Sequence, residues 1–128
     1  MKILLLDIET APNLAYVWGL WKEYVNVERM VNSSYVLCWS AKWVGSEDLL
    51  FASVEGDDHL GMLDKIHQLL DEADVVVHYN GKSFDIPTLN KEFVSFGFPP
   101  PAPYKQVDLL VVVRDKFRFP STKLDYVA

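Results

Sequence analysis

Two short apolar runs constrain the fold of this chain most strongly, because each is uninterrupted and each ends abruptly in polar residues. Ile3–Leu6 leads into Asp7-Ile8-Glu9-Thr10, and Val75–Val77 leads into His78-Tyr79-Asn80-Gly81. Short, wholly apolar strands are typical of parallel sheets covered on both faces, whereas strands with one solvated face alternate. We therefore expect two inner strands of one sheet, with Ile3–Leu6 as the central strand.

The segments between these runs predict an antiparallel hairpin and a helix. Alternation from Tyr35 to Trp43, a turn at Gly45-Ser46 and strand character from Leu49 to Val54 predict the hairpin. Apolar residues from Met62 to Ala73 recur at helical spacing, and Asp57 or Asp58 offers the N-cap. The stretch 11–32 fits neither period, so we expect a loop with one helical turn.

The second half predicts a helix that Asp85 caps and Gly97 ends, followed by a stiff connector at Pro99–Pro103. The rest predicts a strand from Val107 to Leu110, a helix from Val111 to Phe117 and a last helix capped by Ser121. Helical crossovers require parallel strands, while the hairpin adds an antiparallel one. The fold class is therefore α/β, with a mixed central sheet flanked by helices.

Length and composition limit the possible functions. The chain has 128 residues, half of them apolar, which predicts a single domain over residues 1–128. A net charge of −6 argues against the broad basic face of non-specific nucleic-acid binders, so any polyanion must be held locally or through metal ions. The lone Cys38 excludes an internal disulfide, and no apolar run approaches the ~20 residues of a membrane span. We expect a cytoplasmic protein with no membrane partner.

Asp7 and Glu9 are the first candidate site residues. Residues two apart on a strand point to the same face, about 6–7 Å apart along the backbone. Two carboxylates at the end of a buried strand repel each other unless a cation such as Mg²⁺ neutralises them. The alternative is that both simply leave the sheet into solvent, and the spacing does not decide between the two.

Asp85 follows the second inner strand, at the sheet end that a parallel arrangement brings beside Asp7 and Glu9. Its plain interpretation is a helix N-cap, which does not exclude a second role. Three converging carboxylates would suit two divalent ions about 4 Å apart, the arrangement that stabilises the attacking and leaving oxygens in phosphodiester hydrolysis.

The motifs Asp7-Ile8-Glu9-Thr10 and Asn80-Gly81-Lys82-Ser83-Phe84-Asp85 resemble the first two motifs of the DEDD (DnaQ-like) 3′–5′ exonucleases, which have a ribonuclease H-like fold. The resemblance spans nearly the whole chain and includes the order of strands and helices. It implies metal-dependent removal of nucleotides from single-stranded or frayed DNA (or RNA) 3′ ends. It also implies two Mg²⁺ or Mn²⁺ ions on Asp7, Glu9 and Asp85, and a setting in replication, repair or a phage, beside a polymerase or other replication protein.

The family's third motif, a Tyr or His followed four residues later by a fourth carboxylate, has no clear match. Tyr104 and Asp108 satisfy the spacing, but on a strand positions four apart lie some 13 Å from each other. Asp108 is therefore a weak candidate for the fourth metal ligand, with a strand-end aspartate as the alternative, and Asp125 is weaker still. We expect a family member truncated before its last catalytic segment, or one completed by another chain.

Several other residues are candidates for contacts with substrate. Thr10, Asn80 and Phe84 lie in the two motifs, Lys82 could meet a phosphate, and Trp18 and Trp21 could stack on terminal bases. Packing or solvation is the alternative for the last three. His78 has the profile of a hydrogen-bonded structural histidine, and His59 and His67 of helix-surface residues.

Three hypotheses follow. The first is the exonuclease. The second is a non-catalytic nucleic-acid-binding or assembly module of the same fold with an incomplete metal site. The third is an endonuclease of the wider ribonuclease H-like fold, which would release internal fragments.

Overall fold

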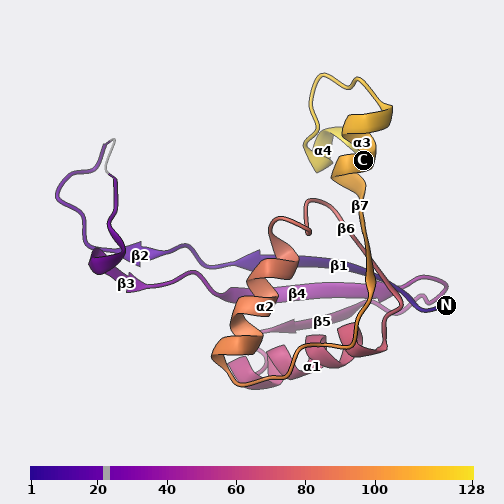
Figure 1. Cartoon of the computed structure of the whole chain (residues 1–128), viewed down its shortest axis with the longest axis horizontal. Helices are drawn as coiled ribbons and strands as arrows, with labels where there is room; N and C mark the ends of the chain where they lie inside the picture. The colour runs from indigo at the N-terminus through magenta and orange to yellow at the C-terminus, as the bar shows by residue number, and fades with distance from the viewer. Residues whose placement is uncertain (22–23) are drawn as a thin grey trace.

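The computed structural model of the chain describes residues 1–21 and 24–128, and Figure 1 shows its arrangement. The strands are β1 (Ile3–Thr10), β2 (Leu14–Ala15), β3 (Met30–Asn32), β4 (Val36–Trp43), β5 (Leu50–Ser53), β6 (Val75–His78) and β7 (Lys105–Asp108). The helices are η1 (Val27–Arg29), α1 (His59–Glu72), α2 (Asp85–Ser95), α3 (Leu109–Lys116) and α4 (Leu124–Val127).

The main sheet is mixed, as predicted, with strand order β5-β4-β1-β6-β7. The hairpin strands β4 and β5 are antiparallel to their neighbours, whereas β6 is parallel to both β1 and β7. Strand β1 is central and extends beyond β6. The parallel pairing of β1 with β6 ends at Leu5, opposite Val77, whereas the pairing of β1 with β4 continues to Thr10. The end of β1 therefore has an edge without a paired strand, beside the loop after β6.

Helices α1 and α2 cover one face of the sheet (Figure 1). Leu4, Leu6 and Ile8 point into this core, with Ile66 and Phe93 among the helix residues that pack against them. Burial of such side chains contributes roughly 1.5–3 kcal/mol each. Buried and exposed residues alternate along β1, so the strand has one apolar face toward this core and one open face.

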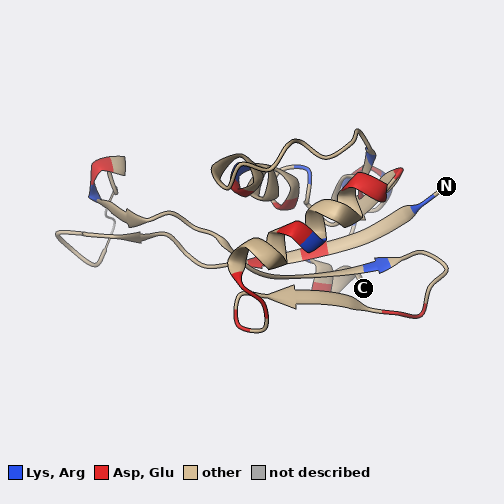
Figure 2. Ribbon diagram, turned by 90° about the horizontal axis from the view of Figure 1, so that it is seen from below, with Lys and Arg blue, Asp and Glu red and all other residues tan. Residues whose placement is uncertain are grey.

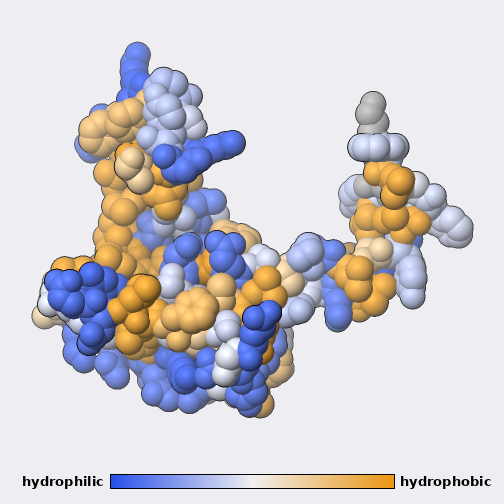
Figure 3. All heavy atoms as spheres, turned by 180° about the vertical axis from the view of Figure 1, so that it is seen from behind, coloured by the Kyte–Doolittle hydropathy of each residue, from blue (hydrophilic) through white to orange (hydrophobic). Residues whose placement is uncertain are grey.

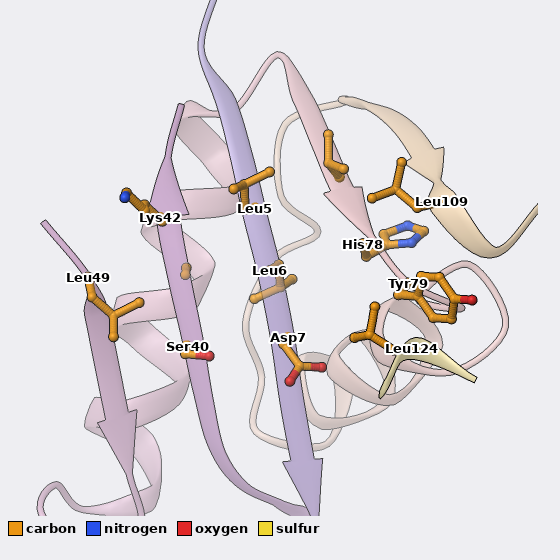
Figure 4. Close-up of a pocket in the computed structure, with 12 residues that line it drawn as sticks. Leu5, Leu6, Asp7, Ser40, Lys42, Leu49, His78, Tyr79, Leu109 and Leu124 are labelled. Carbon is orange, nitrogen blue, oxygen red and sulfur yellow. The ribbon is translucent and has the colours of Figure 1, made fainter. Parts of the chain in front are cut away.

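The prediction that Ile3–Leu6 is covered on both faces is wrong for the part of the chain that the structure describes. Leu5 is 39% exposed, and Asp7 and Glu9 lie on the same open face. A hollow of about 410 Å³ lies there, with Leu5, Asp7 and Tyr79 in its lining (Figure 4). Helices α3 and α4 reach it through Leu109 and Leu124 but do not fill it.

The helix ends agree with the sequence at two positions and differ at two. Asp58 caps α1 by accepting a hydrogen bond from Gly61 N–H at 2.9 Å, and Gly97 follows α2 with φ +78°. Asp85 is not the cap of α2: Phe84 holds that position without a side-chain cap, and Asp85 is the first helical residue. Ser121 does not cap α4 either, because Lys123 precedes that helix; the Ser121 hydroxyl accepts from Lys123 N–H instead. Asp108 caps α3.

The region predicted as a loop with one helical turn does contain a helical turn, η1, but β2 and β3 also pair in it, so it forms a two-stranded arm. Residues 22–23 of this region lie outside the described residues. Figure 1 shows it extending away from the main sheet. Its strands have two and three residues, too short for an alternating pattern to be read from the sequence.

Two histidines expected on helix surfaces are tied to the interior. His67 is buried and its Nε2 lies 2.7 Å from Pro99 O. His59 Nε2 lies 3.0 Å from Glu92 Oε1, and the buried Glu92 also accepts from Val36 N–H. Apolar periodicity missed both, because a polar ring can occupy a core position when a partner satisfies it.

Candidate functional site

Asp7 and Glu9 lie on the same face of β1, as the spacing predicted. Both side chains are exposed, on the side of the sheet opposite to Leu4, Leu6 and Ile8. Asp7 pairs in register with Ser40 of β4, and Figure 4 shows its carboxylate at the edge of the hollow. The strand thus carries two exposed carboxylates to a surface that a ligand can reach.

Asp85 is placed differently, because its side chain is 3% exposed and its Oδ2 has no hydrogen-bond partner among the described residues. Burial first, then the charge of Asp7 and, to a smaller extent, that of Glu9, raise the pKa of the Asp85 carboxyl to about 7. Backbone N–H groups of Ile8 and of Asp85 itself oppose this shift. Asp85 is the first helical residue and not the cap of α2, so its plain interpretation fails; it is a buried acid whose pKa the charges of Asp7 and Glu9 help to raise.

These residues fit a divalent cation by their chemistry. Carboxylate oxygens are the ligands that Mg²⁺ prefers, and a buried oxygen without a partner is the kind of group that a cation satisfies. In the described ranges, no three His, Cys, Asp or Glu side chains are grouped closely enough to hold an ion as they stand. The exposed Asp7 and Glu9 can change rotamer, so the buried Asp85 would be the fixed member of the set.

The loop between β6 and α2 is held by Asp108. Its Oδ1 accepts from Asn80 N–H at 2.8 Å and, as the cap of α3, from Leu110 N–H at 3.0 Å. Asn80 has φ 64°, a left-handed conformation that asparagine tolerates better than most residues. Asp108 ends β7 opposite His78, so it joins the adjacent strand to the loop that leads to Asp85.

His78 holds the same loop from inside, as a structural histidine would. It is buried; its Nδ1 accepts from Gly81 N–H at 3.0 Å, and its Nε2 lies 2.9 Å from Gln106 Oε1. A Cβ on Gly81 would stand 2.3 Å from His78 Cγ. The glycine is therefore required for the close approach of the loop to the ring.

The remaining candidates are divided between the site and more distant positions. Thr10 ends β1 just after a register shift, and Phe84, 43% exposed, directly precedes Asp85. Lys82 is exposed in the loop between β6 and α2. Trp18 and Trp21 lie on the arm.

Ser40 and Lys42 of β4 share the hollow with Asp7, and sequence reasoning did not select them. The sequence pattern could have identified them, because both alternate with the buried Trp39 and Ala41. The predicted strand therefore already places Ser40 and Lys42 on the face of the sheet opposite to the core. What was missing was the register, which pairs Ser40 with Asp7.

Among the described residues, no helix combines the length and apolar character that crossing a lipid bilayer requires.

Comparison with known proteins places this geometry in a family. No curated protein sequence matches the chain. Among solved structures, the family B DNA polymerase from the hyperthermophilic archaeon Pyrobaculum calidifontis is similar, with a TM-score of 0.61 and 20% sequence identity. The match covers 91% of this chain but 16% of the polymerase, and at this identity it shows the shared fold. A family model described as the RNase_H superfamily matches residues 4–128, and the chain therefore belongs to the RNase_H superfamily.

Proposed function

We propose that this chain is a metal-dependent 3′–5′ exonuclease that removes nucleotides from single-stranded or frayed DNA ends. The observation that carries the proposal is the buried Asp85 Oδ2, which has no hydrogen-bond partner in the described part of the chain and faces the charges of Asp7 and Glu9. Membership of the RNase_H superfamily and the polymerase-like fold support a nuclease that acts in DNA replication.

Asp7, Glu9 and Asp85 would together hold the ions. Bound divalent ions supply the charge that activates water and stabilises the leaving 3′ oxygen. Asp85 fixes the depth of the site, because it is buried at the start of α2 beside the free edge of β1. Asp7 and Glu9 close the site from the exposed face.

Residues around these carboxylates would position the terminal nucleotide. Phe84 presents an exposed ring next to Asp85, and Asn80, Lys82 and Thr10 border the same sheet end. A lysine meets a phosphate as a point charge, which suits the otherwise acidic surroundings.

A time course with a 5′-labelled single-stranded DNA oligonucleotide in Mn²⁺ tests the proposal. We expect a ladder that shortens from the 3′ end, that EDTA abolishes and that the Asp7→Asn, Glu9→Gln double variant slows more than about 100-fold. Asp64→Asn, an exposed acid on α1, is the matched control and should leave the ladder unchanged. A double variant that keeps full metal-dependent activity contradicts the proposal. Internal fragments in place of a ladder indicate an endonuclease. A parallel lane with an RNA oligonucleotide shows whether the substrate is DNA or RNA.

A non-catalytic nucleic-acid-binding or assembly module is the second candidate. It is favoured by the present side-chain arrangement, in which the described acids do not form a three-residue group. An oligonucleotide that stays intact in Mn²⁺ but still binds, equally well with and without EDTA, would establish it.

A further inference from the structure

The arm that follows β1, residues 11–21 and 24–35, carries a concentration of exposed aromatic side chains. Four of the nine residues from 16 to 24 are Trp or Tyr. Tyr16, Trp18, Trp21 and Tyr24 are between 75% and 91% exposed, and Figure 3 shows the arm projecting away from the body of the protein. Large exposed aromatic clusters on a soluble fold mark interaction sites.

The base of the arm is fixed to the elements that carry the carboxylates. Ala11 N–H donates to Tyr35 O at 2.8 Å, and the Ser34 hydroxyl donates to Ala11 O at 2.5 Å, so the arm closes on itself directly after β1. Lys91 Nζ of α2 donates to Ser34 O at 2.5 Å. The arm is therefore anchored to β1, which carries Asp7 and Glu9, and to α2, which begins at Asp85.

The arm also differs from the rest of the molecule in charge. Its charged residues are Glu28 and Arg29, one of each sign, so that the arm contributes nothing to the chain's net charge of −6. Figure 2 shows the described residues of the arm in tan, apart from the charged residues of the short η1 segment. A polyanion meets less repulsion on this surface than on the body of the protein.

We infer that the arm is a stacking platform for single-stranded nucleic acid, on which bases upstream of the scissile end rest while that end reaches the carboxylates. This inference rests on the proposed nuclease function. Stacking on an aromatic face contributes about 1–3 kcal/mol per base and tolerates any sequence, so it binds a strand without a basic groove. Tryptophan and tyrosine rings on a neutral arm supply that kind of binding.

Binding of fluorescein-labelled oligo(dT) to the full chain in EDTA tests the inference, with anisotropy as the readout. Because no hydrolysis is needed, the outcome does not depend on whether the nuclease proposal holds. We expect Trp18→Ala, Trp21→Ala to weaken binding at least about 25-fold, since each ring lost corresponds to fivefold or more. Trp18→Phe, Trp21→Phe should restore most of the affinity, and Phe51→Ala, an exposed aromatic on β5, should change nothing.

Salt dependence is the second measurement. A platform that binds through stacking predicts a shallow decrease in affinity between 50 and 200 mM salt, whereas binding to phosphates predicts a steep one. Unchanged oligonucleotide binding by the double alanine variant overturns the inference. If that variant also alters the sedimentation coefficient of the chain, the arm is a protein contact instead.

Discussion

The Asp85 carboxyl is protonated more readily in the folded chain than in water, because it is buried next to two other acids. With its pKa raised from 3.8 to about 7, the folded state holds a proton that the unfolded state releases between these values. The stability that this proton confers is complete below about pH 4 and is lost as the pH rises through 7. The apo protein is therefore expected to lose stability between pH 5 and pH 8.

Asp85→Asn should remove this dependence. Asparagine carries no charge at any pH, so in EDTA the variant should gain about 2–3 kcal/mol relative to the wild type between pH 5 and pH 8. Urea unfolding at both pH values measures it. Asp7→Asn, which removes a contributing charge without removing the buried acid, should give a smaller gain. A stability difference between Asp85→Asn and the wild type that is identical at both pH values would contradict the raised pKa.

Gly81 provides a second test at the residue scale. Gly81→Ala should destabilise the chain by about 1–3 kcal/mol, because the new Cβ would stand 2.3 Å from the buried His78 ring. Gly56→Ala is the matched control, since its Cβ would meet Ser53 Oγ at an ordinary 3.4 Å. Thermal unfolding compares the two, and equal losses would show that the loop can move away from His78.

At the scale of elements, α3 and the β6–α2 loop share a single acceptor, Asp108 Oδ1. Asp108→Ala should cost about 1–2 kcal/mol through the lost cap and release Asn80 N–H. Asp108→Asn keeps an acceptor oxygen, so we expect near wild-type stability.

The same pair of variants decides whether Asp108 is a ligand. If Asp108 only positions the loop, Asp108→Asn should retain most of the Mn²⁺-dependent hydrolysis, while Asp108→Ala loses more. Loss of hydrolysis in Asp108→Asn with unchanged unfolding would instead identify it as the fourth metal-binding carboxylate.

Elements with a clear period could be predicted from the sequence, and elements without one could not. The hairpin Tyr35–Val54, α1 and its Asp58 cap, and the end of α2 at Gly97 each follow from alternation, helical spacing or a capping residue. The arm could not be predicted, because strands of two and three residues have no period to detect. Asp85 could be located as a candidate ligand, but its plain interpretation as a helix cap is wrong, since a cap and a buried first-turn acid have the same local sequence.

At the scale of the whole molecule, the sheet brings together residues from distant parts of the chain. The parallel pairing of β1 with β6 was expected from their apolar runs, and it places the 80–85 loop beside the end of β1. The greater length of β1, which leaves its edge open for Asp85, depends on register and so was beyond the sequence. The open face of the sheet and its hollow could not be predicted from the sequence either. Whether a sheet face is covered depends on which elements pack over the strand and not on the strand's own residues.

The central claim is that Asp7, Glu9 and Asp85 together bind a divalent cation, and isothermal titration of Mn²⁺ into the full chain at pH 7 tests it most directly. We predict saturable binding that releases protons, because Asp85, with its pKa near 7, is only partly ionised before the ion binds. Asp85→Asn and Asp7→Asn should abolish the binding, and Asp64→Asn, on α1, should leave it intact. Identical isotherms for the wild type and Asp85→Asn, with no proton release in either, would contradict the claim.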